Sequence, residues 1–584
     1  MKTLCYILSV AGMLLLAACQ KLDREFVTTL SKQQIEISYG NVRTLLTALY
    51  ADLPDGMLYI GGNAMMASAT DEAEFTNETN PVQAFNTGSW NAISNPDFVW
   101  ATYYRTIRRA NQFLLSTDKI NLDQYRLDPA PAQQLLYNNY LAEIKRWKYE
   151  ARFLRAFYYF ELVKRYGGVP LLKDALTIEE DFSKIKRNSL NECIQFISDE
   201  CDSAAAQLPL NASTTPYVQG TDLGRATKLS ALSLKSRVLL YAASDLFNTP
   251  SWAAGYQNVE YIALPAGDRA ARWKAASDAS KAVIDAAALP TLGAYKSLFN
   301  TFNNAEIIWS RINNVSGNSN AFERANSPIG FPSGQSGNTP SQNLVDAYEI
   351  KVDANTAIPF DWNNPAHAAN PYATTGATAR DPRLFMSVVV NNTQFGTPAR
   401  AVQAWNGGAD GKPLPNASKT GYYLRKYLQE SLNITNGNTG AHSWIFFRYP
   451  EIYLNYAEAL NEWNPGNADI KLYYDKVRTR TGVAMPPLPA GLSQAAVRDK
   501  IRNERRVELA FEDHRFWDVR RWMLAPTYFN APLTGVNITL TGSASFSYAP
   551  FTVENRVFAP KMYLYPIPQT DLTISPLLVQ NPQW

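Results

Sequence analysis

The residues best placed to do acid–base chemistry are three glutamates near the C-terminal end, Glu504, Glu508 and Glu512, followed by His514. On a helix with 3.6 residues per turn, positions four apart lie on one face, so these carboxylates are expected to be neighbours. Two carboxylates held about 5–10 Å apart can act as the acid and the nucleophile or base of a glycosidase. The spacing therefore allows a hydrolytic pair made of Glu504 and Glu508.

The alternative interpretation of the same helix is a lattice of ion pairs. Arginines interleave with the acids, at Arg502, Arg505 and Arg506. A neighbouring guanidinium lowers the pKa of a carboxyl group, whereas a general acid needs a raised one. We therefore interpret Glu504 and Glu508 as structural and predict no enzymatic activity.

Other catalytic or metal-binding patterns are missing from the sequence. The chain has only three histidines, His367, His442 and His514, and none belongs to an HExxH motif. It also lacks a GxSxG motif, a phosphate-binding GxxxxGK[ST] loop and a dinucleotide fingerprint. The acidic run Asp71–Glu74 is too short to indicate a calcium loop. No cofactor or metal is predicted.

Aromatic residues in polar loops suggest a different activity, the binding of sugars. Flat rings stack on the C–H faces of sugars, and amides or hydroxyls pair with sugar hydroxyls. Trp90, with Asn91 beside it, lies in the loop "AFNTGSWNAISNPD" and is the first candidate. The alternative for each ring is burial beneath its own loop, since large rings are usually mostly buried. The other candidate ligand-binding residues are Phe322, Phe331, Trp362 and Trp405.

The N-terminus has the pattern of an export signal. Lys2 precedes an apolar run from Tyr6 to Ala17, which is shorter than the ~18 residues that a membrane-spanning helix needs. The following "LAAC" resembles the lipobox of bacterial lipoproteins, which implies cleavage before Cys19 and acylation of its thiol, for example by palmitate. We thus expect a signal peptide over residues 1–18 and a lipidated tether over 19–37. Two or more acyl chains anchor a protein stably, whereas one is marginal.

Composition excludes one class of partner. The formal net charge is only +3 over 584 residues, and no basic run is present. Nucleic acid is therefore not predicted as a ligand. Aromatic residues make up 12% and charged residues 18% of the chain, which suits a surface that meets uncharged ligands.

Cys193 and Cys201 lie eight residues apart on a helical pattern, too far for a disulfide within one helix, and are expected to face the core.

The elements that must position these residues are mainly helices. Apolar residues recur with helical spacing in six stretches of the first half and three near the end. The predicted helices are Asn41–Leu53, Asp97–Ser116, Ala132–Tyr166, Ser189–Leu208, Leu223–Leu246, Arg269–Ala288, Pro450–Glu462, Asn467–Thr481 and Ser493–Phe511. Their succession suggests helical hairpins.

Between the two helical parts, residues 290–447 are dense in Gly, Asn, Pro, Ser and Thr. Glu306–Ile312 and Phe385–Val390 are the predicted strands. Long loops on a rigid scaffold are where binding residues concentrate, so we place the ligand face in this region. Beyond Trp522 we expect irregular chain that wraps back over the helices.

Several segments together carry a family resemblance. They are "EARFLRAFYYFELVKRYGGVPLL" (Glu150–Leu172), "ARDPRLF" (Ala379–Phe385), "FRYPEIYLNYAEALNE" (Phe447–Glu462), "IRNERRVELAFEDHRFWDVRRW" (Ile501–Trp522) and the C-terminal "YLYPIPQTDLTISPLLVQNPQW". In this order they resemble the SusD/RagB family of surface lipoproteins that bind nutrients for an outer-membrane transporter. The resemblance covers nearly the whole chain after residue 37.

The resemblance implies a mainly α fold, a tetratricopeptide-like scaffold of helical hairpins overlaid by long irregular loops and a few short strands. Residues 38–584 would form a single unit with an N-terminal helical half (38–289), a loop-rich ligand face (290–447) and C-terminal repeats with a wrapping tail (448–584). The implied function is capture of oligosaccharides and their delivery to a SusC-like TonB-dependent transporter barrel. The protein would be lipid-anchored in the outer membrane and face the extracellular side. Peptide capture is the alternative within the same family.

Overall fold

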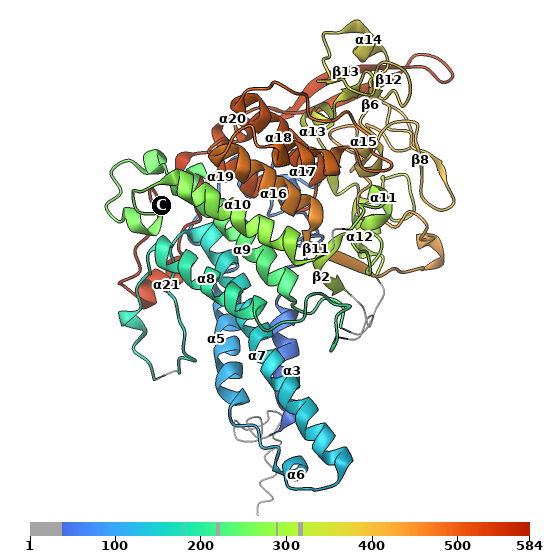
Figure 1. Ribbon diagram of the computed structural model, residues 1–584. Coiled ribbons are helices and arrows are strands. Elements are labelled where there is room, and N and C mark those ends of the chain that lie inside the picture. The colour runs from blue at the N-terminus through green and yellow to red at the C-terminus, as the bar shows by residue number, and fades with distance from the viewer. Residues whose placement is uncertain (1–37, 178, 218–221, 288–289, 314–318) are drawn as a thin grey trace, which may run out of the picture.

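The computed structural model describes residues 38–584 except 178, 218–221, 288–289 and 314–318 (Figure 1). The predicted signal peptide, Cys19 and the tether lie outside the described residues. Within the described chain, no helix combines the length and the apolar character needed to cross a membrane.

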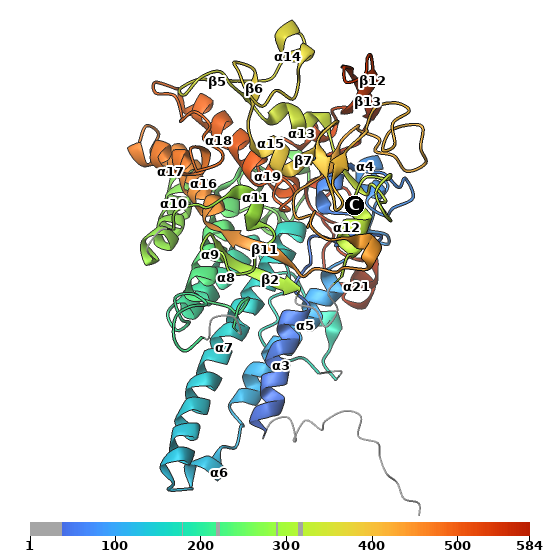
Figure 2. The same ribbon diagram turned by 90° about the vertical axis from the view of Figure 1, so that its right-hand side faces the viewer.

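A scaffold of long helices forms the body of the molecule. Neighbours in the series α5–α7–α8–α9–α10–α16 pack on one another, and α17 and α18 pack on α16 (Figures 1 and 2). This confirms the predicted mainly α fold. The long helices are α3 (Tyr39–Ala51), α5 (Trp100–Thr117), α7 (Pro131–Tyr166), α8 (Leu190–Ala205), α9 (Lys228–Ala243), α10 (Arg269–Ala286), α16 (Tyr449–Trp463), α17 (Ala468–Arg478) and α18 (Gln494–Glu508).

Short helices and small sheets make up most of the rest. The short α-helices include α4 (Gln83–Thr87), α6 (Asp123–Arg126), α12 (Ala321–Asn326), α13 (Gln342–Ala347), α14 (Pro365–Ala369), α15 (Arg383–Ser387), α19 (Arg515–Arg521), α20 (Ala525–Phe529) and α21 (Gln569–Ile574). The antiparallel strand pairs are β1 (Ala73–Phe75) with β3 (Asn338–Pro340), β2 (Ile307–Asn313) with β11 (His442–Arg448), β7 (Val388–Val389) with β10 (Tyr423–Leu424), β8 (Gln394–Phe395) with β9 (Arg400–Ala401), and β12 (Leu533–Leu540) with β13 (Phe546–Glu554). In a sixth sheet β4 (Ile350–Lys351) lies between β5 (Ala357–Ile358) and β6 (Ala379–Arg380).

The helix of the first quoted motif, α7, is buried all round in its C-terminal half. Every residue from Phe153 to Tyr166 is buried, whereas the helical pattern alone predicts one apolar side. Phe157 packs edge-on against Trp309 and Phe446, with ring centroids 5.1 and 5.2 Å apart. The helix ends before Gly167, because the φ of +76° at Gly167 lies outside the helical range. The Tyr261 carbonyl lies so close to Gly167 that no side chain would fit there. These aromatic rings therefore build core.

Several predicted boundaries or elements need correction. α18 ends at Glu508 and not at Phe511, so Glu512 lies beyond the helix, and α5 begins at Trp100 and not at Asp97. The predicted helix from Leu223 begins only at Lys228, as α9, with Thr227 as its N-cap. Gly224 has a φ of +83°, which is not helical, so the helix cannot include the residues before it. Phe385–Val390 is not one strand, since its first residues end α15 and only Val388–Val389 pair as β7. The chain after Trp522 is not wholly irregular, because it includes the long hairpin β12–β13. The predicted strand Glu306–Ile312 is confirmed as β2 within one residue at each end.

The C-terminal tail does wrap over the helices, and Trp90 anchors it. Trp90 is 2% exposed. Its ring lies 4.7 Å from Trp584, 5.0 Å from Tyr565 and 5.1 Å from Phe85, measured between centroids. The first and last parts of the described chain are thus joined through one aromatic cluster.

The glutamates of α18 lie at the centre of a buried ion network. Glu508 is 0% exposed and accepts from Arg448 Nη1 at 2.7 Å and Arg480 Nη1 at 3.0 Å. Arg383 Nη1 bridges Glu504 Oε1 at 2.5 Å and Glu508 Oε2 at 2.9 Å. The network joins α18 to the start of α15, the end of β11 and the end of α17.

The predicted lattice exists, but its cations are not the helix's own arginines. Arg505 instead binds Asp518 at 2.9 Å and Arg506 binds Asp71 at 2.6 Å. Arg502 lies over the Trp522 ring, 5.1 Å from its centroid. Those three arginines point away from the glutamates, and the partners of Glu504 and Glu508 come from segments distant in sequence.

Replacing Glu508 by Gln should lower the free energy of unfolding by about 3–5 kcal/mol, because the arginines that it neutralises stay buried with too little negative charge. Urea denaturation followed by circular dichroism measures the change. The matched control is Asp278→Asn, which breaks the exposed Lys274–Asp278 pair and should leave stability nearly unchanged. Equal stability of Glu508→Gln and wild type would contradict the role given to the network.

Replacing Trp90 by Ala should also cost about 3–5 kcal/mol, because it opens a cavity among buried rings. Trp90→Phe should recover most of that loss. Thermal unfolding measures both variants. If Trp90→Ala unfolds like wild type but loses a ligand, the core role is wrong and the loop prediction stands.

Candidate ligand-binding site

Three of the predicted ligand-binding rings are buried. Trp90 belongs to the aromatic core described above. Phe322 and Phe331 are 3% and 8% exposed. Phe331 lies beneath Arg400, whose guanidinium carbon is 3.9 Å from the ring centroid. Because stacking needs a free ring face, we do not carry these three residues into the proposed site.

Asn91 is exposed, but its side chain is used within its own loop. The amide oxygen accepts from the backbone N–H groups of Ile93 at 2.9 Å and Ser94 at 3.1 Å. This is a turn-forming role of the kind that Asn often has.

Trp362 and Trp405 are half-buried, so each keeps part of a ring at the surface. The Trp362 indole donates to Asp346 Oδ1 at 3.2 Å, and its ring contacts Phe360 at 5.1 Å between centroids. Trp405 lies in the loop after β9. That loop is fixed to β12, since Asn406 N–H donates to the carbonyl of Ile538 at 2.9 Å.

Trp405 begins a continuous row of half-buried rings. Its ring lies 5.2 Å from Phe546, Phe546 lies 6.5 Å from Tyr548, and Tyr548 lies 5.1 Å from Tyr372. We call Trp405, Phe546, Tyr548 and Tyr372 the aromatic row. It lies at the loop-rich end of the molecule, where β6, β12, β13 and α14 are labelled in Figure 1.

The row is supported from below by buried polar groups. The Tyr372 and Tyr422 hydroxyls are 2.7 Å apart, and Tyr422 donates to Gln342 of α13 at 2.5 Å. Burial raises the pKa of Tyr372 and of Tyr548, so both hydroxyls stay neutral in physiological solution. A neutral hydroxyl can both donate to and accept from a sugar hydroxyl. The row thus offers stacking faces with uncharged hydrogen-bonding groups.

Sequence analysis missed Tyr372, Phe546 and Tyr548. A signal existed for two of them, because Phe546 and Tyr548 alternate with small polar residues after the turn-like run "TGSAS". Such alternation is typical of a half-buried hairpin strand. Tyr372 had no local signal, since only the folded chain brings it to β13.

A separate groove of about 760 Å³ runs along β2, lined among others by Leu223, Gly224, Ile308 and Tyr449. β2 pairs with β11 along one edge, and no strand of the described chain lies on its other edge. The Gly224 backbone lies close to the carbonyl of Ser310, so this edge is open only in part. Of the three aromatic residues in its lining, Trp309 and Tyr449 are 2% and 4% exposed, and Phe302 is half-buried.

The acidic clusters are unsuited to hydrolysis. Glu504 and Glu508 are 1% and 0% exposed. The guanidinium groups of Arg448, Arg480 and Arg383 hold the pKa of Glu508 well below its usual range despite its burial, which is the opposite of what a general acid requires. The glycosidase interpretation of this pair therefore has no support from its geometry.

The Asp71–Glu74 segment is structural as well. Asp71 binds Arg515 and Arg506, and Glu74 binds Arg556 at 2.7 Å. Across the described residues, no group of three His, Cys, Asp or Glu side chains is placed to hold a metal ion. Cys193 and Cys201 are free and buried, as predicted.

Comparisons with known proteins agree on one family. Residues 305–584 match the model described as "SusD family", and residues 31–240 match "Starch-binding associating with outer membrane". SusD-like protein P25 of Formosa agariphila is 24% identical over 93% of this chain and 91% of its own length. SusD-like protein P2 of the same organism is 23% identical over 85% of this chain and 82% of its own.

Solved structures give the same result. A SusD-like protein from Bacteroides fragilis superposes with a TM-score of 0.74 at 26% identity, covering 94% of this chain and 98% of its own. A SusD-like carbohydrate binding protein from the same species gives 0.72 at 24% identity, covering 93% and 100%. A laminarin binding SusD-like protein gives 0.60 at 20% identity, covering 93% and 99%. The chain belongs to the SusD/RagB family.

Proposed function

We propose that this protein is a cell-surface lipoprotein that binds oligosaccharides on the aromatic row and passes them to a TonB-dependent outer-membrane transporter. The observation that carries the proposal is the row itself, four half-buried rings in ring-to-ring contact with neutral hydroxyls among them. Sugars meet such a surface without having to displace a strongly hydrated charge.

The similar proteins support carbohydrate as the ligand class and the outer membrane as the location. One structural neighbour is a carbohydrate binding protein and another binds laminarin. One matching family model describes starch binding in association with the outer membrane. Anchoring would come from acylation of Cys19.

The chain's own residues would bind and orient the ligand without breaking a bond. Trp405, Phe546 and the ring of Tyr372 would stack on sugar faces, and the hydroxyl of Tyr548 would fix the orientation of the ligand. Because the row is open to one side, the docked transporter would complete the enclosure around the ligand.

An extended peptide is the second candidate ligand, favoured by the groove along β2. A peptide strand could pair with the open part of the β2 edge, where main-chain hydrogen bonds give affinity and side pockets give specificity. Its binding would depend on Ile308 and Leu223 rather than on the aromatic row.

Trp405→Ala and Tyr372→Ala should each weaken oligosaccharide binding by about 1–2 kcal/mol, because each removes one ring face from the site. Calorimetry against a panel of neutral and acidic polysaccharides and of peptides measures the effect. Trp463→Ala is the matched control, since Trp463 is a half-buried tryptophan at the end of α16. If no sugar binds, and if a peptide binds to Trp405→Ala as well as to the wild type, the ligand-binding site is the β2 groove and not the aromatic row.

Cys19→Ala should remove the protein from the outer membrane fraction, because no acyl chain then holds it. Cell fractionation and metabolic labelling with palmitate measure the change. Cys193→Ala is the control and should still be labelled. Persistent palmitate labelling of Cys19→Ala would show that the anchor lies elsewhere.

A further inference from the structure

Asp346 has a free carboxylate oxygen next to the half-buried ring of Trp362. This aspartate lies on α13 and is itself half-buried. Its Oδ1 atom accepts two hydrogen bonds, from the Gln342 side-chain amide at 2.7 Å and from the Trp362 indole at 3.2 Å. Its Oδ2 atom accepts from no group of the described chain, and it is not enclosed in the core. A hydrogen-bond acceptor is therefore available beside the Trp362 ring.

The charge of this carboxylate is not cancelled by an ion pair. Among the described residues, no Lys, Arg or His side chain contacts it. Burial raises the pKa of Asp346, whereas the hydrogen bond from Gln342 and the charge of Arg380 lower it. Arg380 is only 2% exposed, and its guanidinium donates to three backbone carbonyls. A ligand at this place would thus meet the carboxylate and not the guanidinium.

A chain of hydrogen bonds connects Asp346 to the aromatic row. Because a carboxylate accepts but does not donate, Gln342 turns its Nε2 group to Asp346 and its Oε1 atom to Tyr422. Tyr422 uses its proton in the bond to Gln342, so the Tyr372 hydroxyl, 2.7 Å away, donates to Tyr422. The proton of Tyr372 is therefore directed inward, and Asp346 and the row share one support.

The packing of the elements agrees with this connection. α13 packs on β12, and α14, which follows Trp362 closely in the chain, packs on β13. α13 and α14 both lie at the loop-rich end of the molecule (Figure 2). Trp362 and the aromatic row thus lie over the same hairpin.

The free oxygen of Asp346 restricts the chemistry of a ligand. Since it only accepts, the ligand has to supply an O–H or N–H donor. A sugar hydroxyl does this, and a hydrogen bond to a charged acceptor is roughly twice as strong as one between neutral groups. A carboxylate or sulfate on the sugar would instead place a second negative charge beside Asp346, which is unfavourable.

We propose that Trp362 and Asp346 form a subsite which continues the aromatic row and makes the protein select uncharged sugars over acidic ones. Trp362 stacks on one sugar ring, and Asp346 Oδ2 accepts from the hydroxyl groups of that ring. The inference rests on the proposed sugar-binding function and names the class of sugar.

The test uses an array of glucose, galactose and mannose oligosaccharides, each present also with its primary alcohols oxidised to carboxylates. The wild type should bind neutral members at least tenfold more tightly than their oxidised counterparts. Asp346→Asn puts an amide donor in place of the free acceptor, so it should weaken the binding of neutral sugars about tenfold and abolish the preference.

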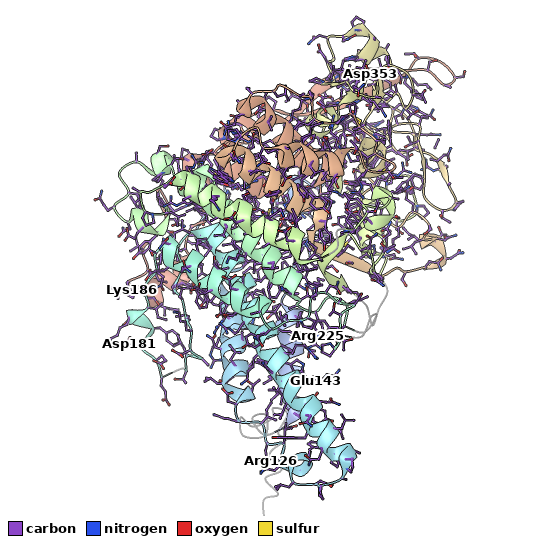
Figure 3. The ribbon with its side chains drawn as sticks, viewed as in Figure 1. Arg126, Glu143, Asp181, Lys186, Arg225 and Asp353 are labelled. Atoms are coloured by element: carbon purple, nitrogen blue, oxygen red, sulfur yellow. The ribbon has the colours of Figure 1, made fainter. Side chains whose placement is uncertain are left out.

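The matched control is Asp353→Asn. Asp353 is an exposed carboxylate at the same end of the molecule, labelled in Figure 3. It accepts from the backbone N–H groups of Asn355 and Thr356, which an Asn can also do. The substitution removes the same charge away from Trp362 and should keep the preference for neutral sugars.

Trp362→Ala distinguishes recognition by Asp346 from mere support of the indole. Loss of the ring should weaken the binding of neutral and oxidised sugars to the same degree. If Asp346→Asn does the same, Asp346 only holds the indole and the proposal is wrong. Equal or tighter binding of oxidised sugars by the wild type overturns it as well, and this measurement decides if Asp346→Asn does not fold in a thermal unfolding assay.

Trp405→Ala tests the proposed function separately. If Trp405→Ala binds sugars like the wild type while Asp346→Asn loses the charge preference, the aromatic row is wrong and the subsite stands. If Trp405→Ala weakens sugar binding but Asp346→Asn keeps the preference, the row stands and the subsite is wrong. If the folded wild type binds no member of the array, both proposals are overturned.

Discussion

The rest of the structure depends on one constraint, the mutual neutralisation of buried charges around Glu508. Neither the arginines nor the glutamates of this network could enter the core alone, because an unpaired buried charge costs several kcal/mol. Glu508 is paired with Arg383 of α15, Arg448 of β11 and Arg480 just after α17, so these segments reach their places together. The network therefore connects the loop-rich region to the helical scaffold, because each buried charge must meet its partner. Apolar packing alone does not impose this requirement.

That connection explains how long loops can be ordered. β11 leads from the loop-rich region directly into α16, and Arg448, at their junction, also binds Glu512 at 2.6 Å. In the loop-rich region, the buried Gln342 of α13 accepts a hydrogen bond from Tyr422, which lies beneath the aromatic row. The loops are thus fixed at several points by charged or hydrogen-bonded groups, and their rings stand on a rigid support.

Helix period and family motifs were enough to predict the scaffold, because the signal for each long helix is local. The network around Glu508 was predicted in kind but with the wrong arginines, since spacing along one helix says nothing about Arg383 or Arg480 elsewhere in the chain. The burial of Trp90 was missed for a similar reason. Its polar loop looks exposed in the sequence, yet the residues that cover it include Trp584, the last in the chain. The aromatic row could be predicted only at Trp405 and, through strand alternation, at Phe546 and Tyr548.

The openness of the aromatic row has a kinetic consequence. A ligand that lies on half-buried rings is not enclosed, so few groups must move before it can leave, and its residence time should be short. For an enzyme or a storage protein this would be a defect. A protein that must give its cargo to a neighbour benefits from it, because a ligand held too tightly is captured but not passed on.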